Sequence, residues 1–140
     1  MNRERILALA EHLEQVLHHE VSSGGFTTMS DMFNRLRHCK PMKFFNMGSY
    51  CAAIGDEDPE CMTAGCIAGH AVALWPPYRF VEHSGWYSDA RRILGLDSYE
   101  ADALFYLPTG RDMSAVQPHE AAQACRRLVD DVPLDKLWDD

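Results

Sequence analysis

Residues 63–77 read TAGCIAGHAVALWPP, and this stretch decides the expected fold. Thr63 is a favourable N-cap for a helix, whereas Pro76 and Pro77 end one because proline lacks a backbone N–H group. Apolar and small residues lie between these two signals, and the small residues allow another backbone to pack closely. The pattern therefore predicts a central, buried helix from Thr63 to Trp75.

Helical signals recur on both sides of this stretch. Apolar residues at steps of three and four predict a long N-terminal helix with one apolar stripe. Gly95 is placed to end a helix in the left-handed conformation, and Asp97 with Glu100 forms a capping box for the next one. Pro118 suits the first turn of a last helix. Further helices are expected over residues 3–20, 29–36, 88–94, 98–105 and 118–131.

These elements predict an all-α fold in which residues 1–140 form a single compact domain of five or six short helices. At most a minor β-hairpin is expected, from residues 43–47 and 78–81, and residues 55–60 read as a loop. The composition, with 46% hydrophobic and 24% charged residues, is typical of a globular domain and excludes a disordered tail. A chain of 140 residues can bury enough surface to fold without a metal or a disulfide.

The net charge of −8 is unevenly distributed along the chain. Residues 1–50 carry six Lys/Arg and five Asp/Glu, whereas residues 51–140 carry seven and sixteen. A surface of this sign repels phosphate, so direct nucleic-acid binding is disfavoured and a basic partner is favoured.

The cysteines and the N-terminus indicate in which cellular compartment the protein is expected. The chain has five cysteines, an odd number, and its N-terminus is charged and amphipathic where a signal peptide would be continuously apolar. We therefore expect reduced thiols and a cytoplasmic protein. Because no apolar run approaches the roughly 20 residues that span a bilayer, no membrane association is expected.

Two motifs resemble a set of small uncharacterised proteins of bacteria and their phages. Residues 45–47 read FNM and residues 61–71 read CMTAGCIAGHA, similar to F-D-M-x-x-W followed by C-G-T-x-x-C-I-A-G-x-A in that set. A pattern similar to A-x-x-x-L-G-L-x-x-x-x-A-x-x-L-F recurs over residues 90–105. The departures from the pattern are Asn46, Tyr50 and Met62. The resemblance covers most of the chain after Phe44; it implies a shared fold and a bacterial or phage origin, and it brings no activity with it.

The motif most suggestive of a metal-binding or catalytic site consists of Cys61, Cys66 and His70. On a helix Cys66 and His70 share a face, and Cys61 comes just before the N-terminus. Zinc ligands would then be close together, although tight Cys/His knuckles of the usual spacing are missing. A thiol nucleophile with His70 as its base is a further alternative. The favoured interpretation is structural, with Cys66 as a small buried residue, and neither a catalytic residue nor a metal or cofactor is predicted.

The remaining polar clusters are predicted to lie on the surface of the protein. The histidines of the N-terminal helix and the basic residues after it are expected on solvated faces. Residues 88–105 have the outline of a helix-turn-helix, but the second helix offers Glu100 and Asp102 instead of cations, so an αα-hairpin is favoured. The two clusters assigned to solvent are His12, His18, His19 and Glu20, and Arg35, Arg37, His38, Lys40 and Lys43.

Two groups of carboxylates carry the functional hypothesis. They either keep the protein soluble or bind a basic surface of a bacterial protein or complex. We favour an acidic protein-binding module without enzymatic activity, of the kind a phage encodes to inhibit a nucleic-acid-handling defence complex, as anti-CRISPR proteins do. The small Cys/His metal protein or thiol enzyme is the alternative, and the oligomeric state is left open. The predicted partner-binding residues are Asp56, Glu57, Asp58 and Glu60, together with Asp130, Asp131 and Asp135.

Overall fold

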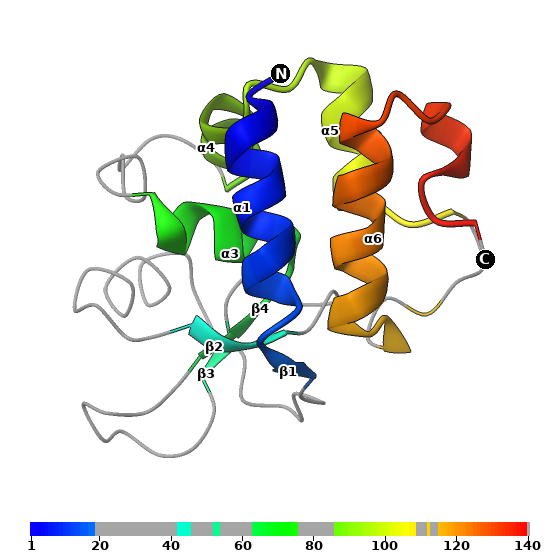
Figure 1. The fold of residues 1–140 in the computed structure, drawn as a ribbon. Helices are drawn as coiled ribbons and strands as arrows, with labels where there is room; N and C mark the ends of the chain where they lie inside the picture. The colour runs from blue at the N-terminus through cyan, green and yellow to red at the C-terminus, as the bar shows by residue number, and fades with distance from the viewer. Residues whose placement is uncertain are drawn as a thin grey trace.

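The computed structural model describes residues 1–18, 42–45, 52–53, 63–75, 86–108, 112 and 115–139 (Figure 1). Within them, the helices are α1 (Arg3–Leu13), α3 (Ile67–Leu74), α4 (Trp86–Leu94), α5 (Ser98–Phe105), α6 (Pro118–Val129) and the 3-10 helix η2 (Leu134–Lys136). The strands are β1 (Leu17–His18), β2 (Met42–Phe45), β3 (Ala52–Ala53) and β4 (Thr63–Gly65). The predicted helix at residues 29–36, the strand at 78–81 and the loop at 55–60 lie outside the described residues.

The predicted all-α class is confirmed, because the helices supply nearly the whole described core. α1 lies beside α6, and α3 packs against α4 (Figure 1). Their inward faces bury aliphatic residues completely, among them Leu9 of α1, Ile67 of α3 and Leu104 of α5. None of the described helices is long and apolar enough to span a membrane.

The strand content differs from the predicted hairpin. Four short strands form one sheet in the order β1-β2-β4-β3, in which β1 and β4 both run parallel to β2 and only β3 is antiparallel to its neighbour. Leu17 pairs with Phe44, and Phe44 pairs with Ala64. Because these partners are far apart in sequence, no local turn signal reveals the pairing.

The central helix begins later than predicted. Thr63 lies in β4 and does not cap a helix; its backbone pairs with β2 and β3. Cys66, with an extended backbone, is the N-cap of α3, and the helix runs from Ile67 to Leu74, close to the predicted end at Trp75. Sheet pairing of residues 63–65 therefore overrides the helix signal there. The predicted burial is confirmed for residues 66–71, whereas Leu74 at the end of the helix is 37% exposed.

The N-terminal helix is shorter than predicted. α1 ends at Leu13 instead of near Glu20, and Leu17 and His18 form β1. The apolar stripe is correct as far as Leu13, which is fully buried. Beyond it, Leu17 is 68% exposed and its backbone pairs with β2, so the continued apolar spacing does not reflect a helix.

Three helix-boundary signals in the second half of the chain are confirmed, whereas the helix predicted at residues 88–94 begins earlier, at Trp86. Gly95 has φ +66°, and a Cβ there would lie 3.0 Å from the backbone nitrogen of Asn2. Asp97 Oδ1 accepts from the Glu100 N–H at 2.8 Å, and Glu100 Oε1 accepts from the Asp97 N–H at 3.0 Å, which is the predicted capping box. Pro118 occupies the first turn of α6.

Candidate protein-binding surface

The predicted acidic residues that the structure describes lie after α6. Asp130, Asp131 and Asp135 are exposed, the first two in the turn that ends the helix and the third in η2. This turn lies at the end of the molecule where α5 begins (Figure 1). The other predicted group, Asp56, Glu57, Asp58 and Glu60, lies outside the described residues.

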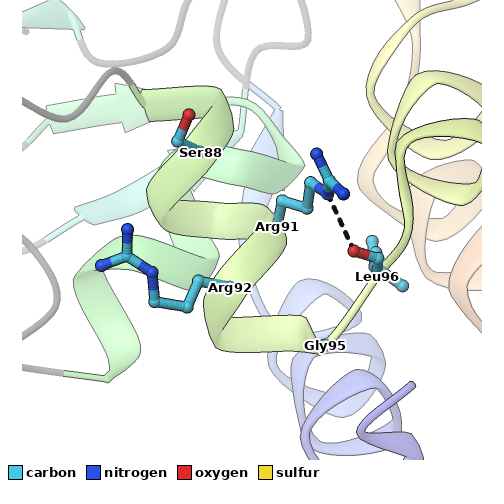
Figure 2. Close-up of a pocket in the computed structure, with 5 residues that line it drawn as sticks. All are labelled: Ser88, Arg91, Arg92, Gly95 and Leu96. Carbon is cyan, nitrogen blue, oxygen red and sulfur yellow. Dashed lines mark hydrogen bonds between the residues drawn. The ribbon is translucent and has the colours of Figure 1, made fainter.

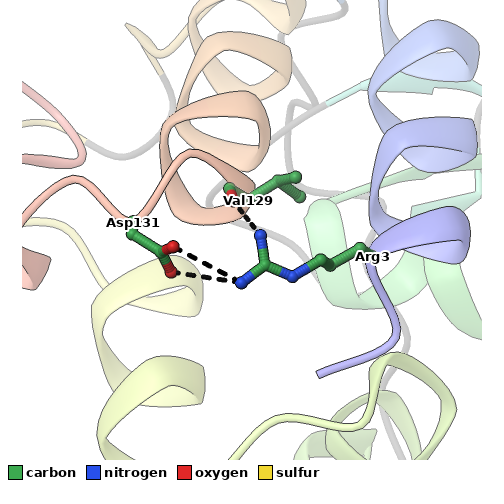
Figure 3. Close-up of polar contacts among 3 residues, drawn as sticks. All are labelled: Arg3, Val129 and Asp131. Atoms are coloured by element: carbon green, nitrogen blue, oxygen red, sulfur yellow. Dashed lines mark hydrogen bonds and ion pairs between the residues drawn. The ribbon is translucent and has the colours of Figure 1, made fainter.

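Asp131 also has a structural contact that the sequence analysis did not predict. Arg3 Nη2 lies 3.3 Å from Asp131 Oδ1, and Arg3 Nη1 donates to the carbonyl oxygen of Val129 (Figure 3). A cation at the end of α6 also complements the negative end of the helix dipole. Both side chains are largely exposed, so the ion pair adds little stability, but it balances part of the charge of Asp131. Asp130 and Asp135 are therefore the better candidates for contact with a cationic partner.

A tyrosine-rich surface lies on α5 and the adjacent start of α4. We call Tyr87, Tyr99, Asp102 and Tyr106 the tyrosine face. Tyr99, Asp102 and Tyr106 are three and four residues apart, which places them on one side of α5 and its C-cap. Tyr99 is 77% exposed and Tyr106 is 47% exposed. Two large aromatic side chains thus face solvent with a carboxylate between them in sequence.

Tyr87 connects this surface into one unit. Its hydroxyl donates to Asp102 Oδ1 at 2.6 Å and also lies 3.2 Å from the carbonyl oxygen of Ser98. Its ring stacks on that of Tyr106, with centroids 6.2 Å apart, and meets the buried Phe105 ring edge-on at 5.9 Å. The hydrogen bond to Asp102 raises the pKa of Tyr87, because the carboxylate favours the protonated phenol. The carboxylate orientation is therefore set by a ring that is itself held by packing.

The tyrosine face is not among the binding residues predicted from the sequence. The apolar side of residues 98–105, formed by Ala101, Leu104 and Phe105, is buried. The signal on the opposite side was the spacing of Tyr99, Asp102 and Tyr106. Tyr87 lies on another helix, so its contribution depends on how α4 packs beside α5.

Two residues of the alternative Cys/His site, Cys66 and His70, are buried. Cys66 is buried and burial raises the pKa of its thiol, which disfavours the nucleophilic thiolate. His70 is buried one turn later, and Cys61 lies outside the described residues. Among the residues that the structure describes, no three His, Cys, Asp or Glu side chains are grouped so as to hold a metal ion.

His70 instead contacts a second histidine. His12 Nε2 lies 2.9 Å from His70 Nδ1, which joins α1 to α3, and the His70 ring stacks on Phe45 of β2 with centroids 6.1 Å apart. His12 is half-buried, so its predicted place on a solvated face is wrong. The hydrogen bond requires one ring nitrogen to donate and the other to accept, and two imidazolium rings could not form it. Burial lowers the pKa of His12 and thereby favours its neutral form.

We expect this pair to make the fold sensitive to mild acid. An unfolded histidine titrates near pH 6.5, whereas His12 in the folded chain titrates lower, so the unfolded state binds more protons between the two values. The free energy of unfolding should therefore fall as the pH drops through and below about 6.5. Urea denaturation at several pH values between 5 and 7.5 would measure the slope.

Two variants separate this effect from general acid sensitivity. His12→Gln removes the titrating group and should flatten the slope, whereas His119→Gln, a substitution at an exposed position of α6, is the matched control. Carboxylates titrate mostly below this window and contribute little to it. Equal slopes in the wild type and in His12→Gln would contradict the assignment.

Pockets among the described residues lie beside α4 and beside α6. One, of about 300 Å³, is lined by Ser88, Arg91, Arg92, Gly95 and Leu96. Arg91 and Arg92 leave α4 in opposite directions, and Arg91 Nε donates to the Leu96 carbonyl oxygen at 3.0 Å (Figure 2). Because the two guanidinium groups diverge, they do not form a common anion site.

A second pocket, of about 360 Å³, lies between α6 and the C-terminal residues. Arg127 on its wall donates to the carbonyl oxygen of Leu137 at 3.0 Å and to that of Asp139. Its guanidinium thus holds the backbone of the C-terminal residues against α6. We interpret this pocket as part of the seam between α6 and the residues that follow it.

No family model matches the chain, and neither a curated protein nor a solved structure is significantly similar to it. Among the residues that the structure describes, the tyrosine face and the nearby exposed carboxylates are the groups best placed to contact another molecule.

Proposed function

We propose that the chain is an acidic protein-binding module whose tyrosine face contacts a basic surface of a bacterial protein or complex. The observation that carries this proposal is the exposure of Tyr99 and Tyr106 on either side of Asp102. Tyrosine is enriched at protein interfaces because its large rigid ring gives contact area at a small entropy cost. A helix that served only as a scaffold would gain nothing from exposing two such rings.

The charges near the tyrosine face determine the sign of the charge expected on the partner. Asp102 lies within the tyrosine face, and Asp97 is exposed just before α5 begins. Asp130 and Asp135 are exposed on the segment after α6, which contacts α5 through η2. A net charge of −8 would attract a cationic partner over long range.

A basic groove that normally holds nucleic acid is the partner class that fits best. Carboxylates spaced along a rigid surface can occupy the positions of backbone phosphates, and exposed tyrosine rings can occupy those of bases. Together with the resemblance to phage and bacterial proteins, this supports an inhibitor of a nucleic-acid-handling defence complex, of the anti-CRISPR kind. Such a module needs no cofactor and does not itself bind nucleic acid.

Site-specific photo-crosslinking would test the proposal. With p-benzoylphenylalanine in place of Tyr99, irradiation in a bacterial extract should give a discrete covalent adduct to a basic protein. The yield of the adduct should fall when the salt concentration rises from 0.1 M to 1 M, because the Debye length falls from about 10 Å to about 3 Å. The yield should also fall when Asp130 and Asp135 are both replaced by Asn. Gel shift and mass spectrometry of the adduct provide the measurement.

The control places the same photoreactive residue at Ala8, which is exposed on α1. An adduct of equal yield from both positions would show non-specific contact and contradict the proposal. Added competitor nucleic acid tests whether the partner surface is a nucleic-acid groove. If it is, the competitor should suppress the Tyr99 adduct. An adduct that forms despite the competitor would support the protein-binding module but exclude a nucleic-acid groove as its partner.

A further inference from the structure

The structure shows an aromatic-carboxylate arrangement whose chemistry is more specific than attraction to positive charge. We infer that the tyrosine face recognises arginine side chains of its partner in preference to lysine. This inference rests on the proposed function and names the group that the surface binds. It follows from where the rings stand relative to Asp102 and from how Tyr87 holds that carboxylate.

The spacing on α5 places a ring on each side of the carboxylate. Tyr99 is three residues before Asp102 and Tyr106 is four residues after it, and side chains at these separations are neighbours about 5–6 Å apart at their Cβ atoms on a helix. Tyr106 is the C-cap of α5, with an extended backbone, and its position is set by stacking on Tyr87. The order along the surface is therefore ring, carboxylate, ring.

Tyr87 holds two members of this arrangement, Asp102 and Tyr106, in place before any partner arrives. Its hydroxyl holds Asp102 Oδ1 at 2.6 Å, and its ring is fixed between Tyr106 and the buried Phe105. A surface whose side chains are already ordered loses less conformational entropy on binding. The Asp102 carboxylate and the Tyr106 ring are thus held in place, and Tyr99 is exposed beside them on the same side of α5.

A guanidinium group matches this surface better than an ammonium group. It is planar and weakly hydrated, so it can stack on a tyrosine ring while its N–H groups reach a carboxylate beside the ring. An ammonium group is a strongly hydrated point charge and gains less from the ring face. The chain itself contains such a contact, because the Arg5 guanidinium lies 5.5 Å from the centroid of the Trp75 ring.

Three fluorescent ten-residue peptides would test the inference on the full-length chain. They alternate glycine with arginine, lysine or citrulline, the last being a planar, uncharged analogue of arginine. Fluorescence anisotropy in 0.15 M salt should show the arginine peptide binding about two- to fivefold more tightly than the lysine peptide, as expected from one exposed cation–π contact. The citrulline peptide should bind much more weakly than either, because it lacks the charge that Asp102 attracts.

Matched variants identify the groups responsible. Tyr99→Leu combined with Tyr106→Leu removes both exposed rings and should abolish the preference for arginine over lysine, while Tyr99→Phe combined with Tyr106→Phe should retain it. Asp102→Asn should weaken binding of both cationic peptides. Circular dichroism melts of each variant would show that the helices are intact.

The outcomes separate this inference from the proposed function. Equal affinity for the arginine and lysine peptides, or no measurable binding of the arginine peptide, would overturn the inference. A preference that survives loss of both rings would also overturn it, because the discrimination would then come from elsewhere. In each of these cases the proposed function would still stand if the Tyr99 photo-adduct forms; without that adduct, the function itself fails.

Discussion

Replacing Ile67 by Asp should unfold the helical core. Ile67 is fully buried at the first position of α3, which contacts α1, α4 and α5. An aspartate there would bury a polar group without a designed partner and remove aliphatic packing, at a cost of at least about 4 kcal/mol. Since a domain of this size is stable by only about 5–15 kcal/mol, the melting temperature should fall by about 10 °C or more, or the cooperative transition should disappear. Circular dichroism during heating would measure this.

Leu74→Asp is the matched control on the same helix. Leu74 ends α3 and is 37% exposed, so an aspartate there remains hydrated. Its expected cost is below about 1 kcal/mol, part of it from a negative charge at the negative end of the helix dipole. If both variants melted like the wild type, α3 could not be the central element of the core.

Replacing Trp138 by Ala should cost about 3–5 kcal/mol, the usual range for loss of a buried tryptophan. Trp138 is 7% exposed, and its indole Nε1 donates to the carbonyl oxygen of Ala103 in α5 at 2.9 Å. It therefore anchors the residues after α6 to the helix that carries the tyrosine face. The free energy of unfolding should be measured by urea denaturation followed by circular dichroism.

Two further substitutions test which interactions of Trp138 account for this loss of stability. Trp138→Phe keeps much of the apolar contact but loses the hydrogen bond, so it should cost less than Trp138→Ala. Asp139→Ala alters an exposed side chain whose residue contacts Arg127 only through its backbone carbonyl, and it should change stability by no more than about 0.5 kcal/mol. Equal effects of Trp138→Ala and Asp139→Ala would contradict the anchoring role.

The candidate site could be predicted only in part. The sequence indicated acidic residues as contact groups, and Asp130 and Asp135 are indeed exposed. It did not indicate that Asp131 is partly balanced by Arg3, because these residues are 128 positions apart. Nor did it indicate the tyrosine face, whose rigidity depends on Tyr87 reaching Asp102 from a different helix. Charge and exposure have local signals, but the partner of each side chain does not.

The sequence by itself determined the features whose cause lies within a few residues. The left-handed Gly95, the Asp97–Glu100 capping box and Pro118 in the first turn of α6 each depend on backbone geometry and hydrogen bonds inside one turn, and all three were predicted correctly. The apolar stripes also identified the inward faces of the described helices, because burial of such a stripe is the main source of helix stability.

Tertiary structure alone decided the features that join distant segments. Residues 63–65 form a strand because β2 and β3 pair with them, although their local sequence favours the start of a helix. His12 is half-buried because α3 brings His70 to it from 58 positions away. In both cases the free energy comes from a partner that is remote in sequence, so no window of neighbouring residues contains it.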